Sequence, residues 1–343
     1  MDDKPPSMQQ WKALYGAASE FKAIECWDWM WGSDMFGVQD PTSGEIGYCS
    51  VTGRLREYFA LTVYLGAEGI KGYASMQRGK SRSAAESLLH QLKCLVASFE
   101  DREFLEGQDM EILRGLGLKF RGRDAWPLFR SYRPGYYPWY LTAAEAECLT
   151  MALKQTMSVA MRFRDDPDML TPPAKNRYLV RVPEQAKGGP KWKDEWLAPR
   201  PLQRQVVVAE PVDRDSLERI KRGIQERRGV WELDFSHSPM AVSEAKGSRP
   251  YYPYMLLCVD HDSGFVLISE IAGSGENPSE AVRRMPGLVE STGFLPKEMW
   301  VASEDALELV GPFAAGLGIE LKRVKRLPAL QRARSELFRF LRR

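Results

Sequence analysis

This chain of 343 residues has few histidines, and its few cysteines are far apart in the sequence. It has three histidines and five cysteines, and no two cysteines are spaced C-x-x-C. An odd number of unpaired cysteines indicates neither a disulfide framework nor a structural zinc site, and it is typical of reduced thiols in the cytoplasm. The chain also lacks a phosphate-binding P-loop, a G-x-S-x-G elbow and an H-E-x-x-H helix, which excludes the commonest enzyme signatures.

Long apolar runs and a strong net charge are missing too. No apolar run reaches the roughly 18 residues of a membrane span, and the polar start MDDKPPSMQQ does not resemble a secretory signal. The formal net charge is only +2, so no general affinity for nucleic acid or membrane is expected. With 44% hydrophobic and 27% charged residues, the composition predicts a soluble cytoplasmic protein of about two domains.

The first 166 residues predict an α+β domain. A capping box at Ser7 begins a helix, and the turn DPTSG at 40–44 joins two strands as a hairpin. A strand at 59–65 and a helix over about 83–99 follow, and Thr142 begins another helix with a second capping box. Residues 167–228 are expected to connect the domains through a strand at 178–182 and a charged helix near 214–228.

Residues 229–343 give the clearest pattern. Strands are expected at 230–235, 254–259 and 265–271, and then helices alternate with strands to the end of the chain. Asn277 and Ser303 are candidate helix caps, and Pro312 is expected to kink or break the second helix. The fold class predicted for this part is α/β, with the order β-β-β-α-β-α-β-α.

Short motifs in this second part resemble the ribonuclease H-like cores of integrases and transposases. The first strand reads W-E-L-D from Trp231 to Asp234, and the next strand ends in V-D-H-D-S-G at 259–264. A proline at 296 then precedes a strand that leads into Ser303, Glu304 and Asp305. The resemblance covers about a third of the chain, and a shared fold alone does not imply a shared activity.

The whole chain also resembles a group of bacterial two-domain proteins of uncharacterised function. The segments that carry this resemblance are 36–53, 116–139 and the terminal strand-helix-strand unit. The resemblance implies an architecture and no activity.

A ribonuclease H-like enzyme holds two Mg²⁺ ions between carboxylates. The resemblance would make Asp234 and Glu304 the metal ligands, with Asp305 as another choice and Glu336 as a third catalytic carboxylate. Glu304 and Asp305 are more simply explained as charges at a helix N-terminus, and Asp234 can be a solvated strand residue. A Mg²⁺-dependent nuclease or strand-transfer enzyme is therefore the alternative function.

Two segments are candidate binding surfaces. Residues 126–140 hold seven aromatic residues and two arginines, which could stack bases, anchor a protein partner or simply pack across the first domain. Residues 319–343 contain nine Lys or Arg and two Glu, which gives a net charge of +7 in 25 residues. That footprint suits nucleic acid or an acidic protein, or it coats the outer face of an amphipathic helix. The candidate binding residues are Trp126, Arg130, Arg133, Tyr136, Tyr137, Trp139, Lys322, Arg323, Lys325 and Arg326.

The sequence does not reveal a specific function. A non-catalytic binding or scaffolding protein without a cofactor is the interpretation that these patterns favour.

Overall fold

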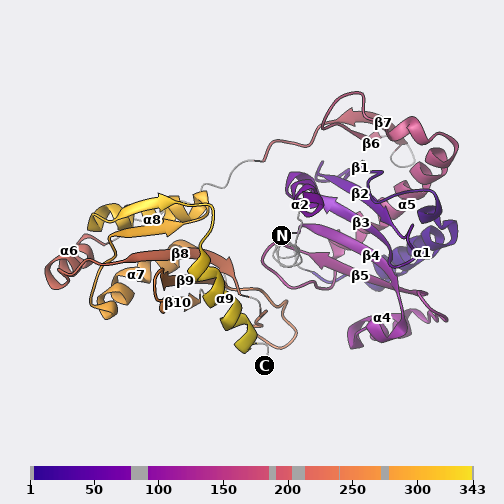
Figure 1. Ribbon diagram of the computed structural model, residues 1–343. Helices are drawn as coiled ribbons and strands as arrows, with labels where there is room; N and C mark the ends of the chain where they lie inside the picture. Colours follow the sequence, from indigo (N-terminus) through magenta and orange to yellow (C-terminus); the bar gives the residue numbers. More distant parts are fainter. Residues whose placement is uncertain are drawn as a thin grey trace. The chain divides into compact units, whose positions relative to one another are not determined.

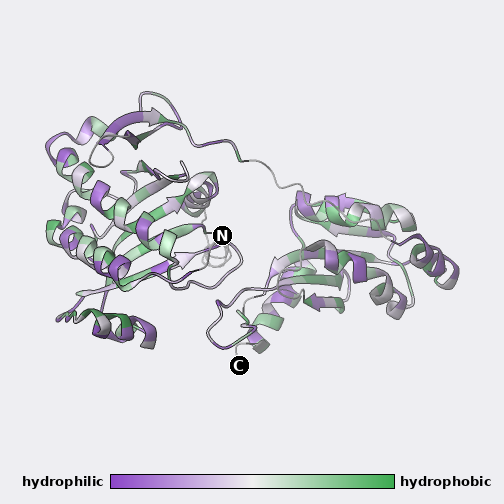
Figure 2. Cartoon of the chain, turned by 180° about the vertical axis from the view of Figure 1, so that it is seen from behind, coloured by the Kyte–Doolittle hydropathy of each residue, from purple (hydrophilic) through white to green (hydrophobic). Residues whose placement is uncertain are grey.

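The computed structural model describes residues 4–78, 92–184, 191–202, 213–238, 240–271 and 278–341. It divides into two compact units, each with its own sheet (Figure 1). The first unit comprises Met1–Pro134 and Pro138–Leu202, and the second comprises Gly135–Tyr137 and Gln203–Arg343. In Figure 2, hydrophilic and hydrophobic residues alternate along the helices of both units, as expected for helices with one buried face.

The first unit is built on a seven-stranded sheet with the order β5-β4-β3-β2-β1-β6-β7. Neighbouring strands are antiparallel, except that β1 and β6 run parallel. The strands are β1 (Phe36–Gln39), β2 (Ile46–Thr52), β3 (Phe59–Leu65), β4 (Cys94–Glu100), β5 (Trp126–Tyr132), β6 (Tyr178–Glu184) and β7 (Lys191–Leu197). The helices are α1 (Met8–Ile24), α2 (Gly66–Arg78), α4 (Gly107–Leu116) and α5 (Ala143–Asp165), with 3₁₀ turns at Cys26–Asp28, Arg102–Phe104 and Pro167–Leu170.

Both faces of this sheet are covered. Helices α1 and α5 bury one face in the larger hydrophobic core, whereas Ile70 of α2 packs with a tyrosine-rich cluster on the other face. Alternation along β2 produces the two faces, because Cys49 belongs to the larger core and its neighbour Tyr48 to the smaller cluster. The capping boxes predicted at Ser7 and Thr142 are confirmed and begin α1 and α5.

The helix predicted over 83–99 is wrong where the structure describes it, because Cys94–Glu100 is strand β4, buried on both faces. Its earlier part lies outside the described residues. The stretch 167–228, expected to connect the domains, is divided between the units. Strands β6 and β7 complete the first sheet, and α6 (Arg214–Gly223) packs with α7 and α8 of the second unit.

The second unit holds a five-stranded sheet with the order β10-β9-β8-β11-β12. Strands β8, β9 and β10 are antiparallel, and β11 runs parallel to both β8 and β12. The strands are β8 (Val230–His237), β9 (Tyr254–Asp260), β10 (Val266–Ile271), β11 (Glu298–Val301) and β12 (Glu320–Arg323). The helices are α6, α7 (Pro278–Thr292), α8 (Glu304–Leu317) and α9 (Pro328–Leu341).

Two layers of helix enclose this sheet. Residues of α6, α7 and α8 pack with Trp231 and Leu233 on one face, and α9 covers Leu257 and Val259 on the other. The predicted cap at Ser303 is confirmed, since its Oγ accepts a hydrogen bond from the Ala306 N–H. Helix α8 runs through Pro312 to Leu317, so of the two predicted effects of this proline, a kink or a break, the break is wrong. The cap predicted at Asn277 lies outside the described part of the chain.

Candidate functional site

Two carboxylates of strand β8 face helix α9. Alternation along the strand sends Trp231 and Leu233 into the larger core, so Glu232 and Asp234 point to the opposite face. Asp234 Oδ2 lies 2.7 Å from Arg334 Nη2, and both side chains are less than a quarter exposed. The first candidate metal ligand is thus ion-paired to the helix that covers it.

Glu232 is fully buried and has two partners. One of its oxygens lies 2.6 Å from His261 Nδ1, and the other accepts a hydrogen bond of 2.8 Å from the backbone N–H of Leu330. That N–H belongs to the first turn of α9, whose amides have no partner within the helix. Glu232 therefore anchors the start of α9, while Asp234 anchors its middle.

The other carboxylates predicted for a two-metal site do not gather around Asp234. Glu304 pairs with Arg323, Asp305 is exposed in the first turn of α8, and Glu336 is exposed on the outer face of α9. Among the described residues, no three Asp, Glu, His or Cys side chains form a group that could hold a metal ion. A Mg²⁺ site on these residues remains a sequence prediction without a matching arrangement.

Sequence reasoning missed Glu232 and His261. The available signal was the alternation of W-E-L-D, which places Glu232 on the same strand face as Asp234. Nothing in the sequence links that face to His261 or Leu330, because their contacts are made only by the folded chain.

The aromatic segment contributes strand β5 and the residues after it. Both arginines in it pair with acidic side chains of the first unit. The Arg130 guanidinium makes two bonds of 2.9 and 2.8 Å to the Asp109 carboxylate and lies 4.7 Å from the Tyr140 ring centroid. Arg133 Nη2 lies 3.1 Å from Glu145, the residue that completes the capping box of α5.

The aromatic residues of this segment differ in exposure. Trp126 is half-buried against Phe120, and the backbone of Trp139 pairs with that of Ser131. Tyr136 and Tyr137 are about two-fifths exposed and group with the second unit, where the Tyr137 N–H donates to the Pro250 carbonyl. These contacts agree better with a segment that packs against the protein than with a free surface for stacking bases.

The basic residues near the end of the chain form two sets. Lys322 lies 2.7 Å from Glu298, holding the pKa of that carboxyl below its usual value, and Arg323 pairs with Glu304. Lys325 and Arg326 are exposed in the turn before α9, and the described chain gives them no ion pair. In the described chain, the first set is therefore paired with acidic side chains and the second set is not.

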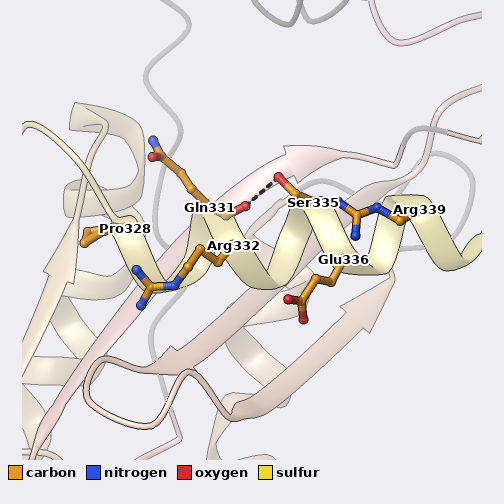
Figure 3. Close-up of a pocket in the computed structure, with 6 residues that line it drawn as sticks. All are labelled: Pro328, Gln331, Arg332, Ser335, Glu336 and Arg339. Atoms are coloured by element: carbon orange, nitrogen blue, oxygen red, sulfur yellow. Dashed lines mark hydrogen bonds between the residues drawn. The ribbon is translucent and has the colours of Figure 1, made fainter.

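The outer face of α9 adds to this second set. Arg332 and Arg339 are exposed, and the described residues give neither an ion-pair partner. Figure 3 shows both side chains on α9, with the Ser335 Oγ donating to the Gln331 carbonyl. The hollow that these arginines help to line has a volume of about 460 Å³. Six residues of this one helix line the hollow: Pro328, Gln331, Arg332, Ser335, Glu336 and Arg339.

Comparison with known proteins supplies no activity. No curated protein matches the chain. In the described residues, no helix is long and apolar enough to cross a membrane. Family models cover most of both units: residues 11–181 match a domain of unknown function, DUF7309, and residues 216–338 match a second domain of unknown function, DUF6930.

Proposed function

We propose that this chain is a non-catalytic binding protein of the cytoplasm, and that its second unit binds nucleic acid. The surface proposed is the outer face of α9 with the turn before it, here called the α9 surface. The observation that carries the proposal is its set of four exposed cations, Lys325, Arg326, Arg332 and Arg339, for which the described chain provides no ion pair.

The spacing of these cations suits a phosphate backbone. Arg332 and Arg339 are seven residues apart, which is about 10.5 Å along a helix, and Lys325 and Arg326 extend the row beyond its first turn. Ser335 lies between the two arginines and Gln331 directly precedes Arg332, and both supply polar groups of the kind that contact phosphates and sugars. Glu336 is the single acidic residue that lines the hollow.

Nucleic acid suits this surface better than an acidic protein does. The centre of a stable protein interface is rich in aromatic and aliphatic anchors. Pro328 is the only apolar residue among the six that line the α9 hollow. Phe340 of α9 is also 75% exposed, and an aromatic ring beside arginines can stack on a base. A cationic surface of this kind is typical of electrostatic contact with a phosphate chain.

The topology of the second unit supports a ribonuclease H-like fold. The sheet order β10-β9-β8-β11-β12 places the first strand at the centre, between its antiparallel partner β9 and the parallel strand β11. In the enzymes that the sequence resembles, the carboxylate of the central strand would hold metal. Here Asp234 is ion-paired with Arg334 and Glu304 with Arg323. Because both carboxylates already have a cationic partner, the arrangement favours a binding function over the nuclease alternative.

The test is the salt dependence of binding. Binding is measured by fluorescence anisotropy with labelled single-stranded and duplex DNA. For each phosphate contacted, the association constant should fall by about 0.7–0.9 log units per tenfold increase in salt concentration. The double variant R332A/R339A should bind DNA more weakly. The slope of log affinity against log salt concentration should fall by the amount that corresponds to about two phosphate contacts. The control K246A removes an exposed lysine elsewhere in the second unit and should change neither quantity.

Three outcomes contradict the proposal. An unchanged slope in R332A/R339A removes the α9 surface from the contact. Binding of polyglutamate in the absence of DNA binding indicates an acidic protein partner instead. Cleavage of the DNA with Mg²⁺ or Mn²⁺ by the wild type but not by D234N restores the nuclease alternative.

A further inference from the structure

A second hollow, in the first unit, is lined by basic and aromatic side chains. It lies where the end of α1, the end of β4 and the loop between α4 and β5 meet, and its volume is about 440 Å³. Ligand sites in proteins commonly have volumes of 300–1,000 Å³. The proposed nucleic-acid surface does not involve this place, which is called the basic hollow below.

Apolar side chains line part of the basic hollow. Phe99 is only 1% exposed, and Pro127 is buried beside it in β5. Phe120 is half-buried, with its ring centroid 6.3 Å from that of Tyr15 and 6.0 Å from that of Trp126. These packing contacts hold the Phe120 ring in place in the hollow that the buried Phe99 also lines, so that a flat ring can stack on Phe120 or meet its edge.

Lys22 brings a partly dehydrated ammonium to this apolar lining. Its Nζ lies 5.3 Å from the Phe99 ring centroid and donates to the Asp124 carbonyl. Burial lowers the pKa of Lys22, although Asp124 and Glu25 act in the opposite direction. An ammonium has three N–H donors, and the described chain supplies an acceptor for one of them.

Lys119 and Arg121 stand at the rim. Both side chains are exposed, and the structure as described gives neither an ion pair. With Lys22 they make three cations among the lining residues, against the single carboxylate of Glu25. The lining therefore carries a formal charge of about +2, which a phosphate monoester, with a charge of about −1.5 to −2, would neutralise.

The backbone around the basic hollow is strained at two places. Glu25 ends α1 with φ 52°, and Asp124 has φ 49° in the loop that supplies Lys119 and Arg121. Residues other than glycine rarely adopt such left-handed conformations, and these conformations concentrate at functional sites. Both residues hold the hollow's edges, since Glu25 lines it and the Asp124 carbonyl fixes Lys22.

We propose that the basic hollow binds a small aromatic phosphate. The ring would lie against Phe120, and the phosphate oxygens would accept hydrogen bonds from Lys22, Lys119 and Arg121. This site is separate from the α9 surface, and neither proposal depends on the other.

Calorimetric titration of the full chain with phenyl phosphate tests the assignment. Inorganic phosphate and benzyl alcohol carry the charge and the ring separately, and each should bind at least about tenfold more weakly than phenyl phosphate. No measurable binding of phenyl phosphate at millimolar concentration overturns the proposal. Equal binding of benzyl alcohol also overturns it, because charge would then contribute nothing.

Variants locate the site. K119A/R121A should keep the fold, since both side chains are exposed, and should weaken phenyl phosphate binding by about tenfold or more. K12A, which removes an exposed lysine of α1 outside the hollow, is the matched control and should bind as the wild type does. R332A/R339A should also bind phenyl phosphate normally. Unchanged affinity in K119A/R121A would show that the ligand binds elsewhere.

Discussion

The Glu232 carboxylate lies 2.6 Å from the His261 ring nitrogen and, through its other oxygen, 2.8 Å from the Leu330 N–H. A fully buried carboxylate thereby joins a strand, the turn after β9 and the first turn of α9. The His261 ring also packs 4.7 Å from the Trp300 ring centroid. The α9 surface is therefore positioned by a polar anchor in addition to the apolar contacts of Leu327, Ala329 and Leu330.

Replacing Glu232 should release the start of α9. E232L leaves the Leu330 N–H without its partner, and we expect the free energy of unfolding to fall by about 2–3 kcal/mol. Hydrogen exchange should accelerate at the Leu330 amide, and urea unfolding of the second unit gives the energy. E336L, on the exposed face of the same helix, should change stability by less than about 0.5 kcal/mol.

The Asp234–Arg334 ion pair should show measurable coupling. Both side chains are mostly but not fully buried, so the pair lies between the surface and core cases. We expect a coupling energy of about 1 kcal/mol from the cycle of D234N, R334M and the double variant. Additive effects in urea denaturation would mean that solvent already screens the pair.

Arg130 should matter for stability rather than for nucleic-acid binding. Its two bonds to Asp109 join side chains that are 12% and 7% exposed, so R130M leaves a buried carboxylate unpaired. We expect a loss of about 3 kcal/mol in the unfolding of the first unit, only partly restored by R130K, because lysine lacks the planar fork. DNA affinity should not change in refolded R130K, and a marked loss would return the aromatic segment to the binding surface.

Acid should weaken the attachment of β7. Burial alone would raise the pKa of Asp194, but the guanidinium groups of Arg162 and Arg181 outweigh it and lower that pKa. A depressed carboxyl pKa stabilises the fold above the unfolded value of about 3.9, and this stabilisation is lost as pH falls through the folded value. The difference in melting temperature between wild type and D194N should therefore be constant near pH 7 and shrink below about pH 4. A difference that does not shrink at all as the pH falls below 4 would contradict this assignment.

Local signals in the sequence predicted much of the fold, and they failed where both faces of a strand are buried. The capping boxes at Ser7 and Thr142 and the turn at 40–44 were sufficient for two helices and a hairpin. Strand β4 reads C-L-V-A-S-F, an apolar run whose period does not distinguish a strand from a helix. Strand β7 was missed because a charged edge strand, K-W-K-D-E-W-L, lacks apolar alternation.

The site was less accessible to sequence reasoning than the fold. Asp234 could be placed on its strand face, but its partner Arg334 lies 100 residues further along the chain. The sequence also could not separate the paired basic residues from the unpaired ones, because only the folded sheet brings Lys322 beside Glu298. The residue types were visible in the sequence, but ion pairs between residues far apart in the chain could not be predicted from it.

The parallel pairing of β1 with β6 has a consequence for how the first unit is made. Strand β1 ends at Gln39, and its partner begins at Tyr178, after β2, β3, α2, β4, α4, β5 and α5 have been synthesised. At about 5–20 residues per second, a ribosome needs roughly 7–28 s to add the intervening stretch of about 140 residues. During that interval the free edge of β1 in the nascent hairpin has unpaired backbone N–H and C=O groups. A chaperone or a neighbouring nascent chain can bind these groups before β6 is made.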